Sequence, residues 1–252
     1  MAKSKAKTKA VHGFKPYDDR TQPTRKISGY PGTQKRSPAR LYPRVISIAD
    51  ATGPRFTSDD VTPEEADLSR EAPDRPRAPG QLISLSGRVL DEVGRPIPDC
   101  LIEIWHANSA GKYIHHNDPS PVPVDANFRG RGRVVTDAQG RWQVRTVKPG
   151  GYAVPDGMPG ATIGWWRPPH IHVSVFGAHF AARLVTQIFF PGDVLNDQDL
   201  ILNAIPDKAA RARMICRYLA HTTSNSAEGD VALRYAHDLV LRGRFETPFE
   251  KH

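Results

Sequence analysis

The alternation of apolar and polar side chains becomes regular at residue 82. Residues 82–90 (LISLSGRVL) and 100–107 (CLIEIWHA) alternate on either side of the turn-like sequence DEVGRPIPD. Successive side chains of a strand point to opposite faces, so this alternation predicts two half-buried strands. Further segments of the same kind are residues 132–137, 141–147, 169–177, 182–190 and 231–243. Short strands separated by turn sequences predict an antiparallel β-sandwich.

The pattern is different at the two ends of the chain. Residues 1–80 are rich in Pro, Arg, Asp and Ser and show little periodicity, which predicts an irregular arm with a helical turn near 62–71. Residues 207–221 (DKAARARMICRYLAH) have helical spacing and good helix formers, so we expect a short helix near the C-terminus. The predicted fold is mainly β, with a β-sandwich domain over residues 81–252 behind the irregular N-terminal arm.

The positive charge of the chain is concentrated at its start. The 252 residues carry a net charge of +8, and residues 1–45 hold 12 Lys and Arg against 2 acidic residues. Residues 1–26 should form a flexible basic tail, and without interleaved aromatic residues or a recognition motif they do not predict nucleic-acid binding. No segment reaches the length of a membrane span, and no apolar signal segment follows the first lysines. We therefore expect a cytoplasmic protein with no membrane partner.

Two histidines lie in the run 165–177 (WWRPPHIHVSVFG). On a strand, residues two apart point to the same face, so His170 and His172 would stand side by side as a pair of metal ligands. Taken alone, such a pair is more often two ordinary hydrogen-bonded histidines, and a metal site needs further ligands. No acidic residue follows His172 closely, and the two cysteines of the chain are too far apart to form a ligand pair.

Two kinds of residue could complete the site. His115 and His116 would make an all-histidine set of the kind that binds zinc. Tyr113 and Tyr152 would instead supply phenolates, which are hard anionic oxygen donors that suit ferric iron better than zinc. A phenol has a pKa near ~10 and binds only an ion acidic enough to displace its proton. The residues alone leave both sets open.

Three segments carry a resemblance to a known family: EIWHANSAGKY, FRGRGRVVTDAQGRWQVRTVKPGGY and WRPPHIHVSVFG. They resemble the intradiol ring-cleaving dioxygenases, and within that family the iron-bearing β chains that act on protocatechuate. The resemblance runs from about residue 27 to the C-terminus, with YPGTQKRSP near the start and LRGRFETPFE near the end. Several separate motifs in the same order make the resemblance specific.

The resemblance implies a ferric ion, Fe(III), held by four protein ligands. These ligands are Tyr113, Tyr152, His170 and His172. It also implies that Arg167 stabilises negative charge on the substrate ring and that Gln187 belongs to the catalytic group. Tyr152 would leave the iron when substrate binds and would then accept a proton. The residues expected to contact the substrate are Tyr30, Arg36 and Trp105.

The same resemblance implies cleavage of a catechol ring between its two hydroxyl-bearing carbons. The substrate would be protocatechuate (3,4-dihydroxybenzoate), which O2 converts to 3-carboxy-cis,cis-muconate in aromatic catabolism. A related α chain without iron would complete a hetero-oligomer. Residues 153–164 depart from the family pattern, because this loop is longer and lacks the Trp-Arg pair that often follows the second tyrosine. Substrate contacts from the loop are therefore not predicted.

Two other interpretations remain at this point. The segment SGRVLDEVGRPIPDCLIEIW also looks like the β-sandwich modules of carboxypeptidase-regulatory type, which have no catalysis of their own. A zinc hydrolase that uses four histidines would leave both tyrosines unexplained. Arg167 could equally close a strand end through a salt bridge, and we expect Trp165 and Trp166 in the core rather than in the site.

Overall fold

The computed structural model describes residues 20–24, 27, 60–154, 164–177, 183–220, 224–225, 231–241 and 243–248. Tyr30, Arg36 and most of the long loop expected over 153–164 lie outside these residues. No helix in the described part is long and apolar enough to cross a bilayer.

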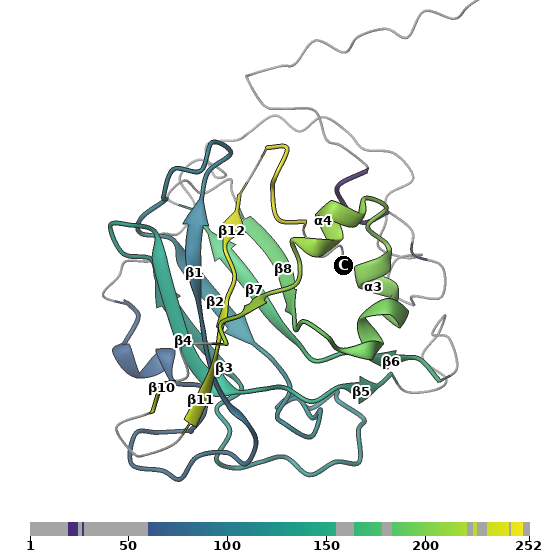
Figure 1. The fold of residues 1–252 in the computed structure, drawn as a ribbon. Coiled ribbons are helices and arrows are strands. Elements are labelled where there is room, and N and C mark those ends of the chain that lie inside the picture. The colour runs from purple at the N-terminus through teal and green to yellow at the C-terminus, as the bar shows by residue number, and fades with distance from the viewer. Residues whose placement is uncertain are drawn as a thin grey trace, which may run out of the picture.

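The first sheet is built around the long strand β1 (Leu82–Leu90) (Figure 1). One edge of β1 pairs antiparallel with β4 (Arg141–Val147). Its other edge pairs with β11 (Val231–Ala236) and then with β12 (Leu239–Val240), and both of these pairs are parallel. The short strands next to β11 are β9 (Arg217–Tyr218) and β10 (Ser224–Asn225). The mainly β sandwich is confirmed, although β1 also has parallel partners.

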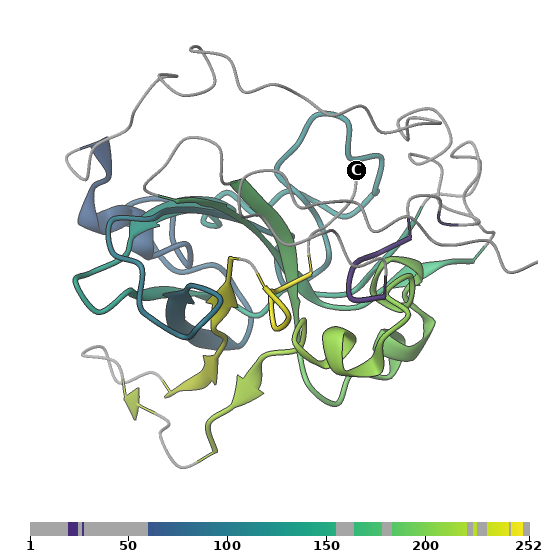
Figure 2. The same cartoon turned by 90° about the horizontal axis from the view of Figure 1, so that it is seen from above.

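The second sheet carries the two histidines of the strand over 169–177, and each of its described pairs is antiparallel. Its strands, in spatial order, are β3 (Arg131–Val135), β2 (Leu101–Trp105), β7 (His170–Phe176) and β8 (Arg183–Phe189). A separate ribbon joins β5 (Tyr152–Ala153) to β6 (Trp166–Arg167). Seen from above, the helical segment lies beside the two sheets rather than over a sheet face (Figure 2).

The main core fills the space between the two sheets with alternate residues of the strands. On β7, Ile171, Val173 and Val175 are fully buried in this core. The alternate residues of β7 (His170, His172 and Ser174) point the other way and are buried as well. β7 is therefore covered on both faces, by the core on one side and by the candidate site on the other.

The helices after β8 are shorter than the sequence predicts. They are η3 (Val194–Gln198), α3 (Leu200–Asn203) and α4 (Lys208–Ala212). The predicted helix over 207–221 is wrong beyond residue 212. Phe189 of β8 exchanges backbone hydrogen bonds with Met214 and Cys216, and this pairing draws the chain out of helical geometry.

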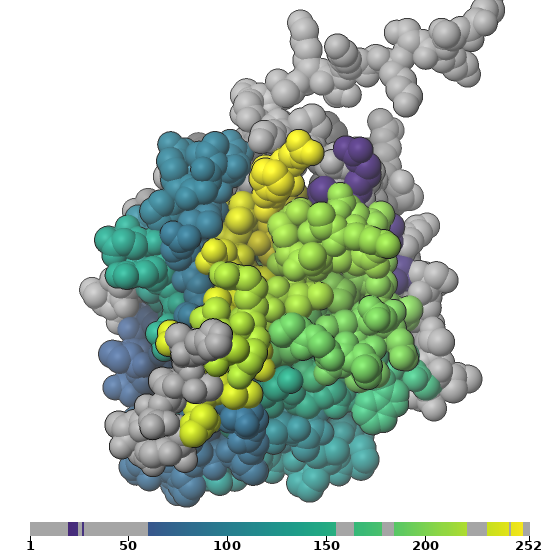
Figure 3. Space-filling view, in the orientation of Figure 1, coloured from purple at the N-terminus to yellow at the C-terminus, as the bar shows by residue number. Residues whose placement is uncertain are grey.

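The strand predicted over 231–243 is divided in two. At the break, a side-chain oxygen of Asp238 accepts a hydrogen bond from the backbone N–H of Arg88 at 2.9 Å. A side chain thus takes the place of a backbone acceptor, and β11 and β12 lie on either side of it. The residues near the C-terminal end run across one face of the molecule, between the first sheet and the helical segment (Figure 3).

Residues 60–80, which the sequence assigns to the arm, pack against the sheets. The predicted helical turn is a 3-10 helix, η2 (Pro63–Ala66). Just after it, Leu68 is fully buried in the main core, and its N–H donates to the carbonyl of Arg145 at 2.7 Å. These contacts tie η2 to β4 of the first sheet.

Candidate active site

His170 and His172 lie on the same face of β7, with ring centroids 4.9 Å apart. Trp105 stands opposite His172 in the β2–β7 register, and its ring stacks on that imidazole at 5.0 Å between centroids with 8° between planes. Phe189 stands opposite His170 on β8 and stacks on it at 5.8 Å. The sheet register therefore places an aromatic ring against each imidazole. Only 2% of His170 and 8% of His172 is exposed.

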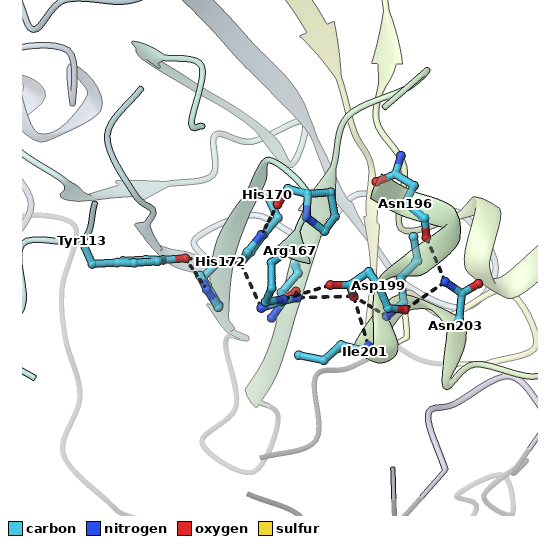
Figure 4. A network of polar contacts seen from close by, with 11 residues as sticks. Tyr113, Arg167, His170, His172, Asn196, Asp199, Ile201 and Asn203 are labelled. Atoms are coloured by element: carbon cyan, nitrogen blue, oxygen red, sulfur yellow. Dashed lines mark hydrogen bonds and ion pairs between the residues drawn. The ribbon is translucent and has the colours of Figure 1, made fainter. Parts of the chain in front are cut away.

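Both tyrosines of the ferric hypothesis reach this histidine pair. The Tyr113 hydroxyl oxygen lies 3.0 Å from Nε2 of His172 and 3.3 Å from Nε2 of His170 (Figure 4). The ring of Tyr152 meets that of Tyr113 edge-on, at 5.5 Å between centroids, and lies 5.7 Å from the His170 ring. Two phenols and two imidazoles from distant parts of the chain thus form one cluster.

Glycines allow the two tyrosine segments to touch through their backbones. Gly111 has a φ of +82°, and a Cβ on it would lie 2.5 Å from the carbonyl oxygen of Gly151. A Cβ on Gly150 would lie 2.4 Å from the carbonyl oxygen of Ser109. These separations are too short for any side chain, so glycine is required on both segments. The motifs NSAGKY and KPGGY therefore share one physical purpose, which is close backbone contact.

An acidic residue anchors the backbone at Tyr113. The N–H of Tyr113 donates to a side-chain oxygen of Asp118 at 2.8 Å. Lys112 is 7% exposed, and its Nζ donates to the carbonyls of Asp118 and Ser120 and forms an ion pair with the Asp118 carboxylate at 3.3 Å. This ion pair closes the loop after Tyr113. Sequence reasoning did not identify Lys112 or Asp118, because neither lies in a ligand-like spacing.

The hydrogen bonds of His170 determine which of its ring nitrogens is available to a metal. Nδ1 lies 2.7 Å from the carbonyl oxygen of Pro168, and a carbonyl only accepts, so the ring hydrogen is on Nδ1. Nε2 therefore carries the lone pair, and it faces Tyr113. A histidine that donates its second nitrogen to a carbonyl is a common arrangement for a metal ligand.

Arg167 reaches the same cluster from the side opposite Tyr113 (Figure 4). Its guanidinium is 4% exposed, and Nη1 lies 3.1 Å from Nε2 of His170. Nε donates to Asp199 at 2.9 Å, so the salt bridge considered from the sequence exists together with the contact to the site. Asp199 is fully buried, and it was not identified from the sequence. An Asp before a helix signals a cap, but nothing in the sequence pairs it with Arg167.

Gln187 completes the group around Arg167. It stands opposite His172 on β8 and is fully buried. Its side-chain carbonyl accepts a hydrogen bond from Nη2 of Arg167 at 2.6 Å. Its amide nitrogen is also buried and has no hydrogen-bond partner among the described residues. The expected residues of the site are therefore together, apart from Tyr30 and Arg36, which lie outside the described chain.

The residues of the zinc hypothesis are not brought together. His115 and His116 are exposed and stack on each other, at 4.5 Å between ring centroids. Within the described residues, no cluster of three or more His, Cys, Asp or Glu side chains could hold a metal. The expectation for the tryptophans is half right, since Trp165 is buried but 51% of Trp166 is exposed. Trp166 lies on the two-stranded β5–β6 ribbon, outside the two larger sheets that enclose the main core.

The donor atoms of the cluster fit ferric iron. Two imidazole nitrogens and two phenol oxygens are the set that the sequence analysis assigned to a strongly Lewis-acidic ion. Both histidines are buried beside aromatic rings, and this low-polarity surrounding strengthens the electrostatic interaction of their ring nitrogens with a bound cation. Arg167 adds an N–H donor directed at His170, and Gln187 accepts a hydrogen bond from the same guanidinium.

Comparison with known proteins agrees with the geometry. A family model described as Dioxygenase matches residues 51–243. The protocatechuate 3,4-dioxygenase beta chain of Burkholderia cepacia is 44% identical over 224 residues, which cover 88% of this chain and 91% of that relative. The alpha chain of the same enzyme from Pseudomonas putida is 31% identical over 176 residues, covering 69% of this chain and 78% of that one.

A solved structure shares the fold as well. The crystal structure of catechol 1,2-dioxygenase from Pseudomonas arvilla C-1 matches with a TM-score of 0.52 and 26% sequence identity, covering 74% of this chain and 59% of that one. The family model covers most of the chain, and the motifs of that family are the ones that meet at His170 and His172. This chain therefore belongs to the intradiol ring-cleaving dioxygenases.

Proposed function

We propose that this chain is the iron-bearing subunit of a protocatechuate 3,4-dioxygenase. It would cleave protocatechuate with O2 between the two hydroxyl-bearing carbons, and the product would be 3-carboxy-cis,cis-muconate. The observation that carries the proposal is the contact of Tyr113 with both His170 and His172, because a phenol against two imidazoles suits ferric iron. The identity to a protocatechuate 3,4-dioxygenase beta chain supports the same class of substrate.

Four side chains would hold the ferric ion. They are Tyr113, Tyr152, His170 and His172. When bound, the ion would supply Lewis acidity that makes the deprotonated catechol accessible near neutral pH and draws electron density from the ring. The support for this assignment is the mutual contact of the four rings and the lone pair on Nε2 of His170.

Tyr152 is the proposed proton acceptor. Its hydroxyl makes no hydrogen bond to any described residue, whereas that of Tyr113 lies against both histidines. Tyr152 also lies on a ribbon of two short strands. The backbone there is less firmly held than that of Tyr113, which is bonded to the Asp118 side chain. A phenolate that leaves its ligand position in this way can take a proton from the incoming catechol at its own oxygen.

Arg167 and Gln187 are proposed to stabilise the negative charge of the substrate. The guanidinium is buried, and a fixed cation in a water-excluded site interacts strongly with charge that builds on the ring. Gln187 would add a neutral donor through its amide nitrogen. Both side chains are held by each other, so they need little reorganisation when the charge develops.

Further proposals concern the substrate carboxylate and a partner. Tyr30, Arg36 and Trp105 are proposed to contact the substrate, with Arg36 as the cation on this chain for its carboxylate. We also propose a hetero-oligomer with an α chain that carries no iron and adds to this surface. The support is that the relatives include a beta chain and, from another organism, an alpha chain of protocatechuate 3,4-dioxygenase.

The test is to purify this chain alone and together with its own α-type chain. We expect iron in the complex, a reddish colour from charge transfer between phenolate and ferric ion, and oxygen uptake with protocatechuate. Catechol and hydroxyquinol serve as comparison substrates. The lone chain should be poorly soluble or poorly active.

Different results would contradict different parts of the proposal. Zinc in place of iron, or a colourless preparation with full activity, would overturn the ferric site. Ring cleavage restricted to catechol would contradict the proposed substrate, protocatechuate, but would agree with the proposed intradiol cleavage. Full activity on protocatechuate of the lone chain as a homodimer would contradict only the proposal of an α-chain partner.

A further inference from the structure

We propose that Asp199 is a positioning residue that fixes the direction in which the Arg167 guanidinium faces the site. The inference rests on the proposed function of Arg167 and extends it to a residue outside the site. Asp199 lies on the connection between η3 and α3, on the side of Arg167 away from the histidines (Figure 4). It touches neither His170 nor His172 through any described hydrogen bond.

The Asp199 carboxylate is held in place by helix α3. One side-chain oxygen accepts hydrogen bonds from the backbone N–H of Ile201 at 3.1 Å and of Leu202 at 2.8 Å, so Asp199 is the N-cap of that helix. Its backbone carbonyl accepts from the side-chain amide of Asn203, which also donates to the carbonyl of Asn196. The carboxylate is fully buried, and it therefore has one fixed position.

The other carboxylate oxygen then determines the orientation of the guanidinium. It accepts from Nε of Arg167 at 2.9 Å, in a pair where 5% of one side chain and none of the other is exposed. Nη2 is occupied by Gln187 at 2.6 Å. A guanidinium is planar, so once Nε and Nη2 are held, Nη1 has to point at His170. The positive charge is directed at the site because its other two nitrogens are held.

The same arrangement also orients Gln187. Its side-chain carbonyl faces Arg167, so its amide nitrogen is turned the other way. That nitrogen is buried and without a hydrogen-bond partner in the described part of the chain, and it is therefore available to a bound molecule. If the Asp199 charge is lost, Arg167 loses the acceptor that fixes its Nε, and the hydrogen bond from Arg167 that orients Gln187 becomes less well directed.

A simpler role for Asp199 would be capping of α3 alone. Asp207 provides the matched comparison, because it caps α4 by accepting from Ala209 and Ala210 at 2.7 and 3.1 Å. Those two hydrogen bonds lower the pKa of Asp207, and the nearby guanidinium groups of Arg213 and Arg20 help to lower it, but no described hydrogen bond joins Asp207 to Arg167. Asn caps a helix about as well as Asp, so Asn substitutions keep both caps, and D199N removes the charge together with the oxygen that accepts from Nε of Arg167. Any difference between D199N and D207N then reports on Arg167.

The experiment measures kcat, KM and iron content of the whole complex carrying D199N, D199A, D207N or R167A. We expect D199N and D199A to lower kcat by roughly 10- to 100-fold, since a misdirected donor loses its effect on developing charge. KM and iron per chain should change less than about threefold, since the donor atoms of the proposed ligands are untouched. D207N should match the unsubstituted complex.

A double-mutant cycle decides whether Asp199 acts through Arg167. In the R167A background, D199N should lower kcat further by less than about twofold, because coupled residues are non-additive. The inference is overturned if D199N keeps normal kcat, if only D199A is impaired, or if the two effects multiply.

A structural measurement separates this inference from the proposed function. If the unsubstituted complex cleaves no ring, the proposed function fails, and the position of the guanidinium still tests Asp199. Crystal structures of the unsubstituted and D199N complexes should then differ by about 1 Å or more at Nη1 of Arg167, a displacement large enough to matter for catalysis. An unmoved guanidinium overturns the inference.

Discussion

At the scale of single residues, the two tyrosines carry the same phenol in different surroundings. Tyr113 is anchored through its backbone to Asp118 and touches both histidines with its hydroxyl. Tyr152 makes ring contacts with Tyr113 and His170, and its hydroxyl has no hydrogen bond within the described chain. These different attachments agree with the proposal that Tyr113 stays bound to the metal while Tyr152 leaves it.

The substitution Tyr152→Phe tests this difference. It should retain iron, because three protein ligands remain, and it should slow substrate binding and turnover by roughly 100-fold, since general-base catalysis contributes about that much. Metal analysis and rapid-mixing kinetics are the measurements. His170→Ala and His172→Ala serve as comparisons and should lose iron. Unchanged kinetics of Tyr152→Phe would remove its role as proton acceptor.

At this scale, the sequence alone predicted a contact between residues only where their spacing along a strand determines which face they share. His170 and His172 were paired correctly because residues two apart on a strand share a face. The approach of Tyr113 to them depends on loop contacts that no local periodicity encodes, so the residues alone offered it only as one of two alternatives and the family resemblance was needed to choose it. Asp199 was missed because its contact with Arg167 joins separate elements.

At the scale of elements, the site depends on backbone contact between the segments that carry Tyr113 and Tyr152. Gly111 and Gly150 make this contact possible. The strands β1, β2, β3, β4, β7 and β8 were predicted nearly to their ends, whereas the strand predicted over 231–243 is divided at Asp238. Alternation marks the longer strands because one face of each lies on the core. The end of the helix at residue 212 was not predicted, because a backbone pairing with β8 overrides local helix propensity there.

The substitution Gly111→Ala tests the contact between the two segments. We expect a loss of stability of about 1–3 kcal/mol from the positive φ, and in addition a loss of iron as the clash with Gly151 separates the tyrosines. Gly94→Ala is the matched control, because Gly94 has a φ of +84° with open space around it. It should lose stability without losing iron. Unfolding midpoints and iron content are measured, and equal iron loss in both variants would contradict the argument.

At the scale of the whole molecule, two buried histidines outside the proposed ligand set make stability depend on pH. Burial lowers the pKa of His106 and of His237 to about 4 in the folded protein. In the unfolded chain each has an ordinary pKa of about 6.5, so the unfolded state binds more protons between these values. Stability is therefore full above about pH 6.5 and is lost as the pH falls toward 4.

The substitution His237→Gln should reduce this dependence. The unfolding free energy should fall less between pH 7 and pH 4.5 than in the unsubstituted protein, by about 2–3 kcal/mol at about 1.4 kcal/mol per pKa unit. Urea unfolding at the two pH values measures the difference. His115→Gln, which changes an exposed side chain, should leave the pH dependence as it is. An unchanged slope for His237→Gln would mean that His237 takes up no protons on unfolding.

The parallel pairing of β1 has a consequence for the order in which the protein is made. Among the described residues, β1 is the first long strand in the chain, and its partners β11 and β12 follow the other long strands. One edge of β1 therefore stays without its native partner until those later strands have been synthesised, and unpaired strand edges invite aggregation. The nascent chain has to be shielded, by chaperones or by its own earlier segments, until its final strands complete the sheet.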